Sequence, residues 1–172
     1  MEIDLGHSAD RDDFTFEETF EIETAEDGSL RCVAVVTGET SRLGSRYYLE
    51  ASVKARLTAP CSRCLEEYEH PVEAGFKLVL ERGAHHAPPE SVAEDDYIEL
   101  DERTEYAYDI FPRVREAIVL ELPIRFLCSE ECRGLCPTCG ADLNEGDCGC
   151  DQTEVDPRWD GLKKLLKPED ES

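Results

Sequence analysis

LEASVKARLTAPCSRCLEEYEHPVEAGFKLVL, residues 49–80, contains two runs in which apolar and polar residues alternate. The apolar positions of the two runs are Leu49, Ala51, Val53, Ala55 and Leu57, then Tyr68, Val72, Ala74, Phe76, Leu78 and Leu80. A period of two is typical of a β-strand with one buried face and one wet face. The short connection between the runs therefore predicts a hairpin of long antiparallel strands, with Cys61-Ser-Arg-Cys64 at its tip.

The segments before and after this hairpin predict further strands. Apolar residues of one parity within residues 14–22 (Phe14, Phe16, Phe20 and Ile22) indicate a strand with one wet face, and residues 30–37 are rich in β-branched residues. We predict a loop at residues 40–45 and a short strand at residues 97–100.

Two helices are expected after these strands. Asp109 opens the first, with Pro112 in its first turn, and Pro123 ends it. Asp156 and Pro157 open the second. The predicted fold class is α+β: a mainly antiparallel sheet, either open or partly closed into a barrel, with one or two helices. We expect three parts: a sheet and helix domain at 1–125, a cysteine-rich zinc module at 126–152, and a C-terminal helix with an acidic tail at 153–172.

Six cysteines lie within residues 128–150, and the last four have the spacing of a zinc site. A two-residue spacer lets two sulfurs bind one ion, and a following glycine allows a tight turn. The intervening residues 141–147 are mostly polar, so metal binding, worth about 10–16 kcal/mol, is what would order them. The predicted zinc ligands are Cys136, Cys139, Cys148 and Cys150.

The remaining cysteines leave the number of zinc ions open at one or two. Cys32 stands alone in an apolar stretch and is expected to be a buried thiol. Cys61 and Cys64 at the hairpin tip could join Cys128 and Cys132 in a second four-sulfur site, which would clamp the cysteine-rich module to the sheet. Alternatively, Cys128 or Cys132 could replace a ligand of the first site.

The composition of the chain argues against several classes of protein. Its 41 acidic and 18 basic residues give 18 − 41 = −23, which disfavours a nucleic-acid coat that neutralises phosphates. The N-terminal residues contain no secretory signal, and no apolar run is long enough to cross a bilayer. We therefore expect a cytoplasmic protein with reduced thiols, where cysteine clusters more often bind metal.

Motifs that would indicate an enzyme are missing from the sequence. It has no phosphate-binding glycine-rich loop, no His-Glu-x-x-His and no Gly-x-Ser-x-Gly. Cys61-x-x-Cys64 does not begin a helix in a βαβ unit, as the thiols of redox enzymes do. A non-enzymatic protein is expected.

The few basic residues define the candidate partner contacts. Arg158, Lys163, Lys164 and Lys167 give the last predicted helix a basic side, and Arg63 lies at the hairpin tip. The acidic balance favours a basic protein partner, with RNA contacted directly or indirectly, and neither DNA nor a membrane is expected.

In this order, the motifs resemble one known family. Cys61-Ser-Arg-Cys64-Leu-Glu is followed by Arg115-Glu-Ala-Ile-Val-Leu-Glu-Leu-Pro123. Next come Cys128 and Cys132-Arg-Gly-Leu-Cys-Pro-Thr-Cys139-Gly-Ala-Asp-Leu-Asn144, then Cys148-Gly-Cys150 and Asp156-Pro-Arg158. This series is similar to the YceD family of large ribosomal RNA subunit accumulation proteins, over about residues 14–166.

The resemblance implies a bacterial or plastid protein needed for accumulation of large-subunit ribosomal RNA. It implies a pre-ribosomal particle or a basic ribosomal protein as the partner, because the family's genes often neighbour that of a small basic protein of the large subunit. It supplies no catalytic residues. The alternative, from another class, is a zinc-binding thiol redox sensor, in which the thiols would be reactive once zinc is released.

Overall fold

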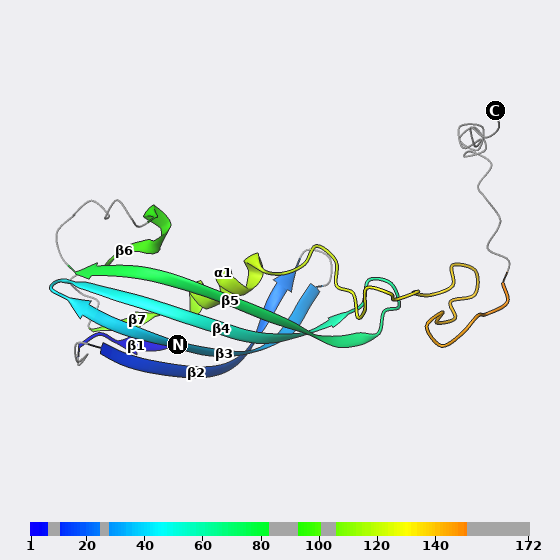
Figure 1. The fold of residues 1–172 in the computed structure, drawn as a ribbon, viewed down its shortest axis with the longest axis horizontal. Helices are drawn as coiled ribbons and strands as arrows, with labels where there is room; N and C mark the ends of the chain where they lie inside the picture. Colours follow the sequence, from blue (N-terminus) through cyan, green and yellow to red (C-terminus); the bar gives the residue numbers. More distant parts are fainter. Residues whose placement is uncertain (7–10, 25–27, 83–92, 101–105, 151–172) are drawn as a thin grey trace, which may run out of the picture.

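The computed structural model describes residues 1–6, 11–24, 28–82, 93–100 and 106–150 (Figure 1). In chain order, the elements are β1 (Glu2–Asp4), β2 (Arg11–Thr24), β3 (Gly28–Leu43), β4 (Arg46–Pro60), β5 (Glu67–Arg82), the 3-10 helix η1 (Glu94–Asp96), β6 (Tyr97–Leu100), β7 (Ala107–Asp109) and α1 (Phe111–Leu120). The second predicted helix and its basic residues, Arg158, Lys163, Lys164 and Lys167, lie outside the described residues.

Five strands form the main sheet, in the order β2-β3-β4-β5-β6. Strands β2 to β5 are antiparallel neighbours, and β6 pairs with β5 in parallel. The predicted hairpin is confirmed, since Leu49 pairs with Leu78 and Pro60 with Glu67. The alternating side chains of β4 point into the core at every second position, including Val53 and Leu57, which are fully buried.

The sheet is open, so the expectation of a partly closed barrel is wrong. Its edges are β2 and β6, and these two strands do not pair with each other among the described residues. Closure needs each edge strand to find a partner, and β6 is only four residues long. The core face of the sheet is covered instead by α1 and by the small antiparallel sheet of β1 and β7 (Figure 1).

Helix α1 confirms the helix predicted between Asp109 and Pro123. Pro112 lies in its first turn, and the Asp109 carboxylate accepts a hydrogen bond of 3.0 Å from the Phe111 N–H. Val114 and Ile118 face the sheet and are buried, while the Phe111 ring meets Phe20 of β2 edge to face at 5.0 Å. Burial of this stripe holds the helix on the sheet, because a ten-residue helix is marginal in isolation.

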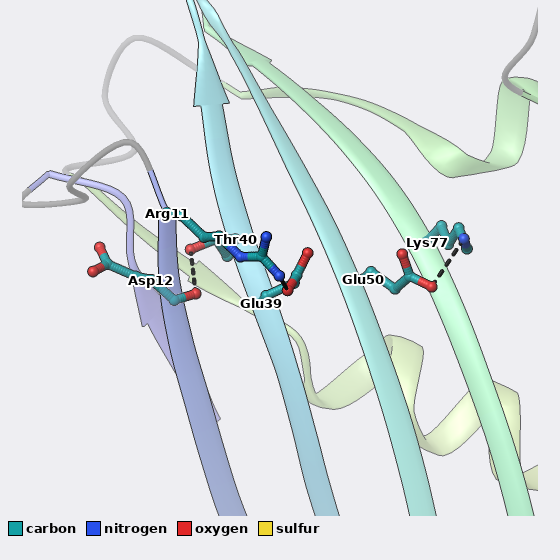
Figure 2. Close-up of polar contacts among 6 residues, drawn as sticks. All are labelled: Arg11, Asp12, Glu39, Thr40, Glu50 and Lys77. Carbon is teal, nitrogen blue, oxygen red and sulfur yellow. Dashed lines mark hydrogen bonds and ion pairs between the residues drawn. The ribbon is translucent and has the colours of Figure 1, made fainter.

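The loop predicted at residues 40–45 is wrong, because β3 continues to Leu43. Thr40 is fully buried, and its hydroxyl donates a hydrogen bond of 3.4 Å to the Asp12 carbonyl on β2 (Figure 2). The turn is only Gly44 and Ser45, where Gly44 adopts a φ of +65°. Thr and Ser favour loops in sequence patterns, but here they pair within the sheet.

Charged side chains occupy the outer face of the sheet. Figure 2 shows Arg11 of β2 paired with Glu39 of β3, and Lys77 of β5 paired with Glu50 of β4 at 2.9 Å. Glu39 and Glu50 are cross-strand partners, so each carboxylate meets a cation on its other side. This face is exposed to solvent, as the period-two pattern predicts.

None of the helices among the described residues has the length and apolar character needed to span a bilayer.

Candidate metal centres

The tip of the β4–β5 hairpin brings two cysteines next to the chain that continues beyond α1. Cys61 and Cys64 lie beside Cys128 and Cys132, and the four sulfurs are all within 4.8 Å of one another. We call these four residues the hairpin-tip cluster. The Ser62 N–H donates a hydrogen bond of 2.8 Å to the Phe126 carbonyl, which fixes the later segment against the tip.

The spacing of the sulfurs in the hairpin-tip cluster suits a tetrahedral metal ion. A zinc ion bonded to four thiolates at about 2.3 Å holds neighbouring sulfurs about 3.8 Å apart. Cys61 Sγ lies 3.8 Å from Cys132 Sγ, and Cys64 Sγ lies 3.7 Å from Cys128 Sγ. Cys61, Cys64 and Cys132 are buried, whereas Cys128 is exposed. The donor set therefore fits zinc.

The last four cysteines form a second group, which we call the C-terminal cluster. The sulfurs of Cys136, Cys139, Cys148 and Cys150 also lie within 4.8 Å of one another. Gly140 turns the chain with a φ of +75°, and its N–H donates a hydrogen bond of 2.8 Å to the Cys136 carbonyl. Cys136 is buried, but Cys139 is exposed, so this cluster is more open to solvent. None of the nine cysteines of the chain forms a disulfide bond.

One thiol in each cluster has a lowered pKa, so it ionises more readily than an ordinary cysteine. Burial raises the pKa of Cys61, but the backbone N–H groups of Cys128, Cys64 and Arg63 outweigh it and lower that pKa to about 6. The backbone N–H groups of Cys139 and Thr138 lower the pKa of Cys136 to about 6 as well. Such N–H groups favour the thiolate because they donate hydrogen bonds to its charge.

The neighbouring thiols resist ionisation. The interaction with Cys61 raises the pKa of Cys128 to about 12, and the interaction with Cys139 does the same for the pKa of Cys150. Adjacent thiolates repel one another, so a cluster can carry several of them only when a cation is present. Each cluster is thus suited to a metal ion that replaces protons when it binds.

Arg63 joins the hairpin tip to the linker between the two clusters. Its Nη1 donates hydrogen bonds to the carbonyls of Glu130 (3.1 Å) and Cys132 (2.8 Å), and its own carbonyl accepts one from the Leu135 N–H (3.1 Å). Gly134 has a φ of +73°, and a Cβ there would come within 2.9 Å of the Arg63 carbonyl oxygen. Arg63, expected to contact a partner, thus makes contacts within its own chain; its contact with a partner stays a prediction.

The structure groups all eight predicted metal ligands into two sets of four. This is the arrangement that the second-site hypothesis requires, and Cys32 lies apart, fully buried in the core. Zinc as the bound metal stays a prediction. Asn144 was not among the predicted site residues, yet its Nδ2 donates to Cys132 Sγ of the hairpin-tip cluster at 3.5 Å. An asparagine in a polar loop gives no signal of such a contact.

Together, the open sheet and the paired thiol clusters define a small α+β protein with two candidate structural metal centres. The family model described as "Large ribosomal RNA subunit accumulation protein YceD" matches residues 49–166, which include most of the β4–β5 hairpin and both clusters. The chain belongs to the YceD family. Membership supports a ribosome-related role.

Similar proteins occur in bacteria and plants. The chain is 30% identical to "Uncharacterized protein YlbN" of Bacillus subtilis, over 96% of this chain and 95% of that protein. It is 32% identical to "Uncharacterized protein Rv2926c" of Mycobacterium tuberculosis, over 70% of this chain and 56% of the relative. The third is "Large ribosomal RNA subunit accumulation protein YCED homolog 1, chloroplastic" of Zea mays, 27% identical over 73% of this chain and 51% of that protein.

The alignments with the mycobacterial and maize proteins thus span only about half the length of those relatives. No solved structure matches the chain significantly.

Proposed function

We propose that this protein is a zinc-stabilised, non-enzymatic ribosome biogenesis factor. It supports accumulation or processing of large-subunit ribosomal RNA by binding a basic ribosomal protein or a pre-ribosomal particle. The observation that carries the proposal is the match of residues 49–166 to the YceD family. The maize relative bears the same description in its name.

The proposed zinc ions have a structural role. Catalytic zinc sites keep one position open for water or substrate, whereas structural sites are closed by four protein ligands. Each cluster offers four sulfurs, which would complete a tetrahedron without a solvent ligand. An ion in the hairpin-tip cluster would hold the segment after α1 on the hairpin tip, and so would support the shape of a binding protein.

The charge of the described surface favours a basic protein partner over naked RNA. β2 forms one edge of the sheet, and it exposes six acidic side chains: Asp12, Asp13, Glu17, Glu18, Glu21 and Glu23. Its one cation, Arg11, is paired with Glu39. Such a surface speeds association with a positively charged partner and makes binding sensitive to salt.

Affinity capture from a lysate of the source organism tests the proposal. We expect the tagged protein to enrich large-subunit precursor RNA, one basic protein of the large subunit, or both, relative to a mock capture. Nuclease treatment separates the two: a protein that stays bound after nuclease is a direct partner, and one that is lost is held through RNA.

A matched pair of charge variants sharpens the capture experiment. The β2 variant carries Glu17→Gln, Glu18→Gln, Glu21→Gln and Glu23→Gln, and the control carries Glu66→Gln, Glu67→Gln, Glu69→Gln and Glu73→Gln near β5. Both lose the same charge, so a surface effect should weaken capture in the first variant alone. If the wild-type chain enriches neither ribosomal RNA nor ribosomal protein, the assembly role is wrong and a thiol redox sensor is favoured.

A further inference from the structure

The loop between Cys139 and Cys148 folds back onto the linker that joins the two clusters. The Leu143 N–H donates a hydrogen bond of 2.9 Å to the Gly134 carbonyl, and Leu135 and Asp142 form an antiparallel bridge. This linker begins at Cys132 of the hairpin-tip cluster and ends at Cys136 of the C-terminal cluster. The loop between Cys139 and Cys148 begins and ends at ligands of the C-terminal cluster. It packs against the linker that carries Cys132, a ligand of the hairpin-tip cluster.

Asn144, in that loop, uses both ends of its amide. Its Oδ1 accepts a hydrogen bond of 2.7 Å from the Arg133 N–H, which fixes the orientation of the amide. Its Nδ2 then faces Asp142 Oδ1 at 2.7 Å and Cys132 Sγ at 3.5 Å. Asp142 Oδ1 also accepts a hydrogen bond of 2.8 Å from the Asn144 backbone N–H, which fixes this carboxylate beside the amide.

We propose that Asn144 is a positioning residue that couples the two metal sites. This inference rests on the proposed zinc binding. When the C-terminal cluster binds its ion, it orders the loop and presents the Asn144 amide to the Cys132 sulfur. A hydrogen bond to a metal-bound thiolate stabilises its charge and its orientation, as second-shell partners do in other metal sites.

Coupling of this kind is reciprocal. If an ion in the C-terminal cluster strengthens binding at the hairpin-tip cluster, an ion at the hairpin-tip cluster strengthens the other site by the same factor. Loss of one ion would then weaken zinc binding at the other cluster without abolishing it.

Zinc competition against a chromophoric chelator tests the coupling on the full-length protein. Asn144→Asp keeps the shape of the side chain but replaces the donor with a charge facing Cys132 and Asp142. Asn144→Ala removes the donor without adding charge. We expect both to weaken zinc binding at the hairpin-tip cluster by about 10–100-fold, the range of second-shell substitutions. Glu145→Gln, in the same loop, is the control and should leave the affinity unchanged.

A double-mutant cycle separates coupling from a local effect. The second background carries Cys148→Ser and Cys150→Ser, which dismantle the C-terminal cluster. The proposal expects Asn144→Ala to change hairpin-tip affinity by less than about threefold in this background. An equal loss in both backgrounds, or no loss in the intact protein, would overturn it. Failure of the wild-type chain to bind two zinc ions would instead refute the two zinc sites on which the coupling rests, and with them the coupling.

Discussion

At the scale of single residues, the two Cys-x-x-Cys turns differ in the residue that comes directly after the second cysteine. Gly140 has a φ of +75° after Cys139, and Leu65 has a φ of +64° after Cys64. Both turns need the left-handed conformation, which glycine adopts freely and which costs other L-residues roughly 1–2 kcal/mol. The Leu65 side chain is 67% exposed, so little burial compensates for that cost.

Leu65→Gly should therefore stabilise the zinc-loaded protein. We expect the free energy of unfolding to rise by about 0.5–1 kcal/mol, the strain relieved less the greater chain entropy of glycine. Chemical denaturation with zinc present measures the change. Leu43→Gly is the matched control: Leu43 is 72% exposed at the end of β3 without a positive φ, so its replacement should lower stability. Equal losses in the two variants would contradict the strain argument.

The spacing of the cysteines along the sequence made the C-terminal cluster easier to predict than the hairpin-tip cluster. The ligands of the C-terminal cluster are close in sequence, and their spacing is a known zinc pattern. Cys61 and Cys132 are 71 residues apart, so only the tertiary fold shows that they meet. Asn144 and the strained Leu65 could not be predicted, because a hydrogen bond to sulfur and a left-handed leucine follow from the surrounding structure.

At the scale of secondary-structure elements, a buried carboxylate joins the strands at one edge of the sheet. Glu81 of β5 accepts hydrogen bonds from Arg46 (2.9 Å), Tyr97 (2.7 Å) and Ser45 (3.0 Å). The Tyr97 hydroxyl is the main cause that lowers the pKa of Glu81 from 4.5 to about 2, and Arg46 and Ser45 act in the same direction against burial. The network ties β6 to the hairpin.

This network predicts a pH-dependent stability. A carboxyl whose pKa falls from 4.5 to about 2 on folding stabilises the protein above pH 4.5, and that contribution is lost as the pH falls toward 2. Glu81→Gln should be less stable than wild type at neutral pH, and the difference should narrow below pH 4.5. Denaturant unfolding at a series of pH values measures it. The control Glu50→Gln removes only an exposed ion pair and should cost less than about 1 kcal/mol; a Glu81→Gln difference that does not change with pH would refute the assignment.

The sequence pattern predicted the long strands, α1 and the short strand β6 at residues 97–100, but not β1 or β7. β1 and β7 are three residues each, too short for a period, and they pair Glu2 with Asp109 across the chain. β3 was predicted to end early because Thr40 and Ser41 resemble a loop, yet Thr40 is buried and its hydroxyl bonds to the edge strand β2. The strand conformation of these segments depends on burial in the folded protein, which local sequence patterns do not show.

At the scale of the whole molecule, the hairpin tip joins the sheet to the cysteine-rich segment. The β4–β5 hairpin extends beyond α1, and the chain after the helix returns to its tip before entering the C-terminal cluster (Figure 1). The cysteine-rich segment has few buried apolar residues of its own, which is why its order is expected to rest on metal. The expected division into parts at 1–125, 126–152 and 153–172 stays a prediction, and one cluster draws ligands from both of the first two.

Native mass spectrometry of the zinc-loaded, full-length protein tests this account most directly, because it counts the ions bound to each chain. The account predicts two zinc ions in the wild type, one in Cys61→Ser, one in Cys136→Ser, and still two in Cys32→Ala, whose thiol lies in the core. A wild-type chain with a single ion that Cys136→Ser removes and Cys61→Ser leaves in place would contradict it, because the hairpin tip would then hold no metal.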